Sequence, residues 1–241
     1  PAGLTASQDD DFAPVTRELL LDPKPEDWLM VHRTYDFHGF SPLDQINREN
    51  VGELRLSWMR AMDEGPQEIR PLVYAGVMYI AHAGGDHVQA LDAITGDLLW
   101  DYERDLPQDL REYVQLGGRT RHLAIYGEHI FHLTADSYLI ALDARTGELA
   151  WETQMADYRE GITHSSGAMI INGMVVSGRT CSPSSLEARC FVAAHDAETG
   201  EERWRTYTAA GSDDPGGETW GNVPTARRVH VSPWGLPGSY D

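Results

Sequence analysis

The chain has 241 residues, of which 38 are acidic and 19 are basic, and its formal net charge is −19 at pH 7. This acidic excess argues against the phosphate backbone of a nucleic acid as a partner. Apolar runs long enough for a membrane-spanning helix do not occur, and the start, PAGLTASQDD, has neither a basic region nor an apolar stretch. We therefore predict no membrane span, and we expect any signal peptide to have been removed already.

The chain divides into an N-terminal lead-in and outer segment, residues 1–60, and a repetitive part, residues 61–241, that we expect to continue beyond the chain end. Within the repetitive part, one sequence pattern occurs at residues 71–81, 122–133 and 166–178. It consists of a run of strand-forming residues, a turn containing glycine and a second run of strand-forming residues. A glycine flanked by valine, isoleucine and aromatic residues predicts a tight hairpin.

A phrase follows each hairpin: ALDAITGDLLW at 90–100, ALDARTGELAW at 141–151 and AHDAETGEERW at 194–204. We interpret it as a third strand, an Asp-Ala-x-Thr-Gly turn and a fourth strand ending in tryptophan. The tryptophans Trp100, Trp151 and Trp204 lie 51 and 53 residues apart. Four antiparallel strands in roughly 50 residues describe one blade of a β-propeller, so the chain would hold about four such units. Each indole is expected to pack between neighbouring blades.

Common catalytic signatures are missing from the sequence. It contains no GxGxxG after a strand, no GxxxxGKS/T loop, no HExxH and no GxSxG. The two cysteines, Cys181 and Cys190, belong to no CxxC or CxxCH arrangement, which argues against a zinc ribbon and covalent haem. In an exported β protein they favour a local disulfide, a free pair being the alternative.

The stretch from Asp27 to Trp204 resembles the pyrroloquinoline quinone (PQQ) dependent alcohol dehydrogenases, and the most distinctive part of the resemblance is SPLDQINRENVGEL at residues 41–54. The resemblance implies an all-β fold, an eight-bladed β-propeller with tryptophan-docking repeats. About four blades cannot close such a ring, so this chain would supply the first half. The C-terminal half of the same propeller would be its partner.

The resemblance also assigns residues to the cofactor. Glu68, in GPQEIRPLV, stands where the family has a glutamate that contacts PQQ, and Arg121 matches an arginine that faces the quinone oxygens. Ser166 takes the place of a threonine that binds a cofactor carboxylate. In VSPWGLPGSYD, Trp234 would lie coplanar with PQQ, with the hydroxyl of Ser232 nearby. The alternatives are an exposed turn carboxylate, a surface arginine, a plain loop serine and a structural tryptophan.

The family's metal is usually Ca²⁺, which prefers several oxygen ligands. By resemblance Glu187 would be one ligand, although its loop is shorter than usual, and otherwise it is a solvated loop charge. The family often carries two adjacent cysteines, joined in a disulfide over the cofactor. Here Gln115 and Leu116 stand in those positions, so that bridge cannot form.

The implied function is PQQ- and Ca²⁺-dependent oxidation of primary or sugar-type alcohols to aldehydes or ketones in the periplasm. Electrons would pass to a cytochrome c or a quinone-type acceptor. Arg121 would help electrostatically, and the general-base aspartate is expected after Asp241, which we interpret as a cleavage end. One alternative is a non-catalytic propeller that acts as a periplasmic assembly scaffold. Another is a sugar- or polymer-oxidising relative with the same cofactor.

Overall fold

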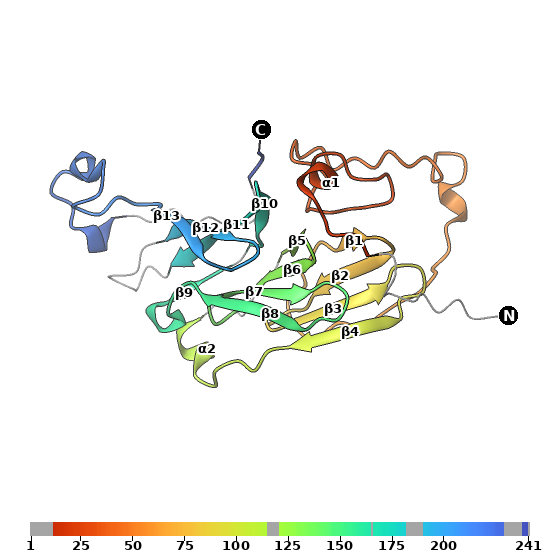
Figure 1. Cartoon of the computed structure of the whole chain (residues 1–241). Coiled ribbons are helices and arrows are strands. Elements are labelled where there is room, and N and C mark those ends of the chain that lie inside the picture. Colours follow the sequence, from red (N-terminus) through yellow and green to blue (C-terminus); the bar gives the residue numbers. More distant parts are fainter. Residues whose placement is uncertain (1–11, 115–120, 165, 182–189, 229–237, 241) are drawn as a thin grey trace.

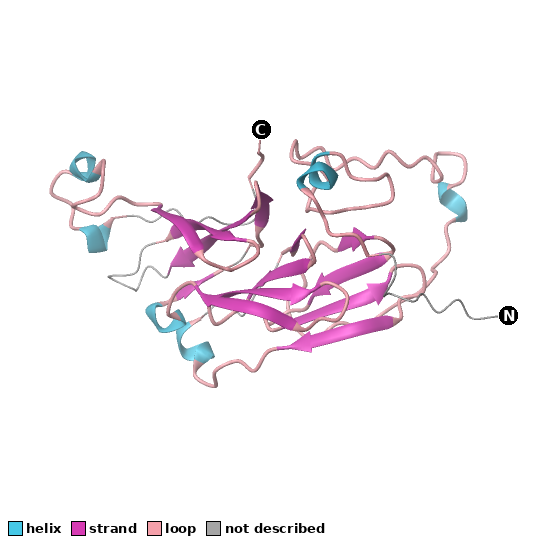
Figure 2. Cartoon of the chain, in the orientation of Figure 1, coloured by secondary structure: helices cyan, strands magenta, loops and turns pink. Residues whose placement is uncertain are grey.

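A computed structural model describes residues 12–114, 121–164, 166–181, 190–228 and 238–240. Three antiparallel sheets follow one another along the chain (Figures 1 and 2). Their strands are β1 (Leu72–Tyr74), β2 (Val77–Ala81), β3 (His87–Asp92) and β4 (Leu98–Glu103); β5 (Ala124–Tyr126), β6 (His129–Leu133), β7 (Tyr138–Asp143) and β8 (Leu149–Gln154); and β9 (Ile162–Thr163), β10 (Met169–Ile171), β11 (Met174–Cys181), β12 (Phe191–Asp196) and β13 (Glu202–Tyr207).

Helices are short and lie between or outside the sheets. They are α1 (Arg17–Leu21), α2 (Leu110–Tyr113) and the 3₁₀ turns η1 (Val51–Glu53), η2 (Tyr158–Glu160), η3 (Gly217–Trp220) and η4 (Thr225–Arg227). In the part of the chain that the structure describes, no helix has the length and apolar character needed to cross a bilayer. The sheets therefore carry the fold.

The predicted hairpins and turns form as expected. At β10–β11 the two turn residues Asn172 and Gly173 have φ of 49° and 74°, the left-handed conformation that asparagine and glycine tolerate. In each repeated phrase the aspartate accepts hydrogen bonds from the second and third amides after it. For Asp92 both distances, to the nitrogens of Ile94 and Thr95, are 2.8 Å. These local bonds reverse the chain between the third and fourth strands of each sheet.

The phrase also joins each sheet to the one before it. A Cβ placed on Gly147 would lie 2.6 Å from Cε3 of Trp100, so only glycine allows the indole to lie flat on this turn. The same relation pairs Gly96 with Trp58 and Gly200 with Trp151. The Trp100 indole also donates a 2.9 Å hydrogen bond from Nε1 to the carbonyl oxygen of Ala144. Trp58, Trp100 and Trp151 thus each pack on the turn of the repeat that follows.

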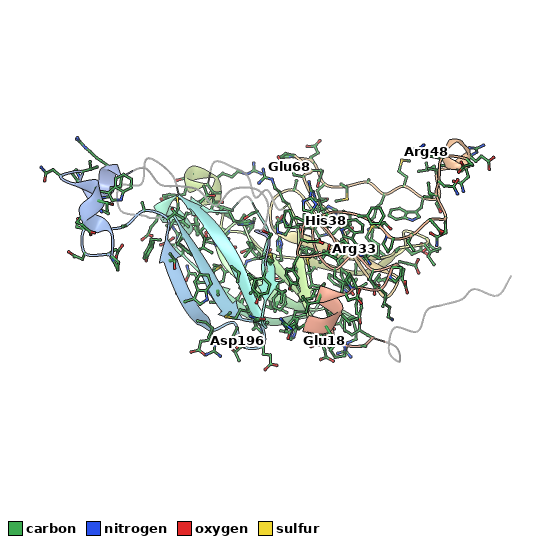
Figure 3. All side chains as sticks on the ribbon, turned by 90° about the horizontal axis from the view of Figure 1, so that it is seen from above. Glu18, Arg33, His38, Arg48, Glu68 and Asp196 are labelled. Carbon is green, nitrogen blue, oxygen red and sulfur yellow. The ribbon has the colours of Figure 1, made fainter. Side chains whose placement is uncertain are left out.

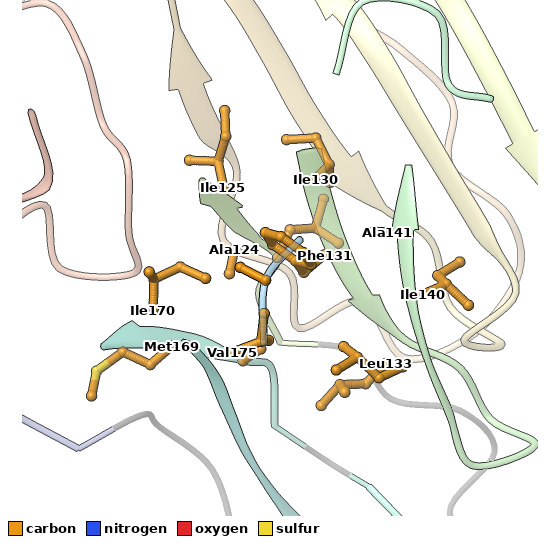
Figure 4. Packing of buried hydrophobic residues seen from close by; sticks show 14 of the residues in the cluster. Ala124, Ile125, Ile130, Phe131, Leu133, Ile140, Ala141, Met169, Ile170 and Val175 are labelled. Atoms are coloured by element: carbon orange, nitrogen blue, oxygen red, sulfur yellow. The ribbon is translucent and has the colours of Figure 1, made fainter. Parts of the chain in front are cut away.

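A continuous core runs between the sheets (Figure 4). Phe131 on β6 and Ile170 on β10 are buried in it. Burying a side chain of this size contributes about 2–3 kcal/mol. β6 and β7 are buried at all but terminal positions, as expected for strands that are covered on both faces.

Two expectations differ from the structure. The spacing of the tryptophans predicts about four units, whereas the described residues form three sheets. The prediction divides the whole chain length by the repeat length and so includes the lead-in. The described residues of the lead-in form no named strand before β1. The tryptophans were also expected to end their strands, but Trp100 lies inside β4, which continues to Glu103. The strand extends because Val88 and His87 of β3 still offer partners to Tyr102 and Glu103.

Candidate functional site

The candidate site lies where the segments leading into the first strands of the three sheets meet. Arg70, just before β1, donates from its backbone nitrogen to the carbonyl oxygen of Arg121 at 2.9 Å and forms a parallel bridge with His122. A Cβ on Gly167, before β10, would lie 2.0 Å from the carbonyl oxygen of His122, so the glycine permits close backbone approach. Residues that precede β1, β5 and β10 are thereby brought side by side.

Glu68 and Arg121 form an ion pair in this region, with 2.6 Å between Glu68 Oε2 and Arg121 Nη2. The guanidinium is mostly shielded from solvent, while the carboxylate is one-third exposed. Glu68 is labelled in Figure 3, where the chain is seen from above. Two residues that the family resemblance assigns separately to one cofactor are therefore in direct contact, and the pair presents a fixed cation next to an acidic oxygen.

Ser166 is buried at the third of these segments, directly before Gly167. The other predicted site residues, Ser232, Trp234 and Glu187, lie outside the described residues, as do Gln115 and Leu116. The structure therefore brings together the segments of Glu68, Arg121 and Ser166.

Sequence reasoning missed a group of buried polar side chains beside these residues. His122 directly follows Arg121, and His164 precedes Ser166 by two positions. Both are almost fully buried, and no ring nitrogen of either has a hydrogen-bond partner among the residues that the structure describes. Burial, followed by the charges of Arg70 and Arg121, lowers the pKa of His122 to about 3. The only signal in the sequence is their position next to the predicted site residues.

Buried histidines predict an acid-sensitive fold. Burial lowers the pKa of His132 and of His195 to about 4, and it also lowers those of His122 and His164, so all four stay neutral in the folded chain near pH 5. In the unfolded chain they take up protons below their usual value of 6.5. The unfolded state then binds more protons than the folded state. The free energy of unfolding therefore decreases as the pH is lowered from 6.5 to about 4.

Each of these histidines should lower the free energy of unfolding by roughly 1 kcal/mol per pH unit in that window. Urea unfolding of the chain at pH 7 and pH 5 measures the effect. The variant His132→Gln should show a shallower dependence on pH than the parent chain. An unchanged slope in His132→Gln would mean that His132 is already protonated in the folded state.

The structure describes only part of the segment that contains the two cysteines. Cys190 is buried and takes part in a disulfide bond. The chain has two cysteines, and the side chain of Cys181, at the end of β11, lies outside the described residues. The loop 182–189, which carries Glu187, lies between these two positions.

Comparison with known proteins defines the fold and then the family. Residues 28–241 match the domain described as PQQ: glucose/ethanol/alcohol dehydrogenase, beta-propeller domain. The three sheets are therefore part of a β-propeller domain of the quinoprotein type. The chain belongs to the family of PQQ-dependent alcohol dehydrogenases.

Individual relatives agree with this assignment. The chain is 38% identical over 215 residues to the dehydrogenase subunit of a quinone alcohol dehydrogenase from Komagataeibacter europaeus, covering 85% of this chain and 29% of that protein. A solved quinohemoprotein alcohol dehydrogenase from Pseudomonas putida has a TM-score of 0.75 at 34% identity and covers 83% of this chain and 30% of its own. A europium-containing methanol dehydrogenase has a TM-score of 0.72 at 30% identity, and the match covers 83% of this chain and 35% of that protein. The chain thus spans about a third or less of the length of these relatives.

Proposed function

We propose that this chain forms the N-terminal part, residues 1–60 as lead-in and 61–241 as blades, of an eight-bladed tryptophan-docking propeller that oxidises alcohols with PQQ and Ca²⁺. Its substrates are primary or sugar-type alcohols, and the products are aldehydes or ketones. We place the protein in the periplasm, with a cytochrome c or a quinone-type group as electron acceptor.

The observation that carries the proposal is the ion pair of Glu68 and Arg121, with 2.6 Å between Oε2 and Nη2, at the meeting point of the three sheets. A planar ortho-quinone with three carboxylates needs a cation, hydroxyl groups and an aromatic surface. The chain offers the guanidinium of Arg121 and the hydroxyl of Ser166 on neighbouring segments. Both residues stand where the family contacts its cofactor.

PQQ, when bound, supplies the two-electron redox chemistry, and the protein supplies position and charge. Arg121 keeps its charge at any working pH and can donate to two adjacent oxygens in one plane. Because Glu68 holds one of its nitrogens, the guanidinium plane is oriented before any ligand arrives. A fixed cation stabilises negative charge that develops next to it without having to reorganise. Arg121 is therefore an electrostatic helper, and Ser166 a hydrogen-bonding group for a carboxylate.

The remaining assignments rest on the family resemblance. Glu187 offers the hard carboxylate oxygen that Ca²⁺ prefers, and further oxygen ligands would come from outside the chain. Trp234 would stack on the plane of the cofactor, with Ser232 as a second hydroxyl. We propose that Cys181 and Cys190 pair and thereby close the loop that holds Glu187. The general-base aspartate would follow Asp241.

Exposed apolar surface supports the presence of further blades. Trp100 is 7% exposed beneath the turn of the second repeat, whereas Trp204, in the same position of the third repeat, is 41% exposed. In the lead-in, Phe40, Leu56 and Met59 are also exposed. Large apolar side chains exposed at two places of the chain favour contact surfaces there. We propose that the C-terminal half of the propeller covers Trp204 and the lead-in.

Reconstitution tests the proposal. The chain is mixed with PQQ and Ca²⁺, with the remaining blades supplied as a second polypeptide, and the absorbance spectrum and alcohol-dependent dye reduction are recorded. We expect a quinone absorbance that co-purifies with protein and dye reduction that requires alcohol, PQQ and Ca²⁺. If the complete propeller assembles but binds no PQQ, the proposal is wrong and the scaffold alternative takes its place.

A further inference from the structure

A second group of ligand-type side chains lies beside the first sheet, in residues that the proposed cofactor site does not use. Asp63, His82 and His87 each offer one ligand atom, and these atoms lie within 4.8 Å of one another. From this geometry we propose that Asp63, His82 and His87 form a binding site for a divalent transition metal ion of the Zn²⁺ type.

The hairpin between β2 and β3 places the two imidazoles together. His82 and His87 flank the loop of residues 83–86, and the backbone nitrogen of His82 donates to the carbonyl oxygen of His87 at 2.9 Å. Residues opposite each other on antiparallel strands carry their side chains on the same face. Accordingly the two rings stack, with centroids 4.0 Å apart. The backbone therefore fixes two nitrogen ligands before any ion binds.

Asp63 contributes the third ligand from the segment before β1. Its Oδ2 lies 3.0 Å from Nδ1 of His82 and 2.6 Å from Nδ1 of His87. Ligands bound tetrahedrally to one zinc ion at about 2.0–2.1 Å lie about 3.3 Å apart, so both contacts must lengthen when the ion enters. Because the Asp63 side chain is 52% exposed, its carboxylate can withdraw slightly to admit the ion. The same exposure leaves a coordination position open to water.

Nδ1 of His82 is in contact with two atoms of Asp63. The backbone N–H of Asp63 donates to Nδ1 of His82 at 3.2 Å, which requires a lone pair on that nitrogen. The Asp63 carboxylate oxygen also faces this nitrogen, at 3.0 Å. Either a proton on Nδ1, donated to the carboxylate, or a metal ion bound by both atoms joins this pair. The proposed ion takes the place of that proton.

His87 has the outer support that metal-binding histidines usually have. Its Nε2 lies 2.6 Å from Oδ1 of Asp101, and the amide of Gln89 donates to the same oxygen at 2.9 Å. With Nε2–H donating to Asp101, Nδ1 is left to bind the metal, which is the carboxylate–histidine–zinc arrangement. Two imidazoles and one carboxylate, with one open position, form a donor set suited to Zn²⁺. Binding would tether the segment that leads to Glu68 to the first sheet.

Isothermal titration of ZnCl₂ into the metal-stripped chain, with Ca²⁺ present throughout, tests the site. We expect one Zn²⁺ per chain, loss of measurable binding in Asp63→Ala and in His87→Gln, and about 10–100-fold weaker binding in Asp101→Asn. His38→Ala is the matched control, because His38 also contacts a carboxylate, Asp36, at 2.9 Å but belongs to no group of three metal-ligand side chains among the described residues. This control should bind as the parent chain does.

Urea unfolding of each variant checks that it remains folded. If Asp63→Ala or His87→Gln does not fold, the comparison of Asp101→Asn with His38→Ala tests the proposal instead. Both of these variants keep all three proposed ligands. The proposal is overturned if the parent chain binds no Zn²⁺, or if Asp63→Ala, His87→Gln and Asp101→Asn bind it as well as His38→Ala. In either case the cluster is an ion pair of His87 with two carboxylates.

Discussion

Replacement of Arg121 by alanine is expected to lower alcohol-dependent dye reduction by the PQQ-loaded propeller by about 100-fold or more. Removal of one preorganised group at a site of developing charge typically costs 10²–10³ in rate. The guanidinium is mostly buried and is held by Glu68 at 2.6 Å. Lysine cannot restore the planar, bidentate geometry, so Arg121→Lys should recover little of the lost rate. Steady-state kinetics with saturating PQQ separates the effect on kcat from weaker cofactor binding.

Arg203→Ala is the control for loss of an arginine. Arg203, on β13, is exposed and pairs with Asp196, at the end of β12, at 2.9 Å. A surface pair of this type contributes about 0–1 kcal/mol, and its removal should leave kcat unchanged. Wild-type kcat in a folded Arg121→Ala variant would contradict the assignment of Arg121.

Replacement of Gly147 by alanine is expected to destabilise the chain by about 3 kcal/mol. Two costs combine at this position. The backbone has φ of +74°, which an L-residue with a Cβ adopts only at a cost, and the new methyl group would lie 2.6 Å from the ring of Trp100. Trp100 is buried and hydrogen-bonded to the carbonyl oxygen of Ala144, so it has little room to withdraw. Urea unfolding monitored by tryptophan fluorescence measures the loss.

Gly76→Ala separates the two costs. Gly76 has φ of +79°, but no heavy atom lies within 4 Å of the position that its Cβ would take. This variant should lose only the backbone contribution, about 1 kcal/mol. Equal losses at Gly76 and Gly147 would mean that contact between the tryptophan and the glycine turn contributes nothing to stability.

Most residues of the candidate site could be predicted from the sequence only through its resemblance to the PQQ-dependent alcohol dehydrogenases. Glu68, Arg121 and Ser166 were assigned by position in a family pattern, and their cofactor roles stay predictions. Their side chains come from three segments separated by about 50 residues, and periodicity within one segment carries no information about such contacts. The ion pair between Glu68 and Arg121 was not predicted, because it depends on the parallel bridge between Arg70 and His122.

The sequence by itself determined the local structure of the repeats. Asp92 and its counterparts fold the turns through bonds to amides two and three residues away, and Asn172 with Gly173 forms a tight hairpin. These interactions span a few residues, so the order of residue types is sufficient to predict them. The repeated phrase predicted four antiparallel strands per unit for the same reason.

Only the tertiary structure decided which residues meet across sheets and strands. Trp100 lies on Gly147 of the next repeat, and Asp63 reaches His82 and His87 from outside their hairpin. Such contacts depend on how twisted sheets pack and where a lead-in segment crosses them, and side-chain burial then selects the arrangement. No spacing in the sequence encodes those distances, so the tryptophan contacts and the proposed metal site became visible only in three dimensions.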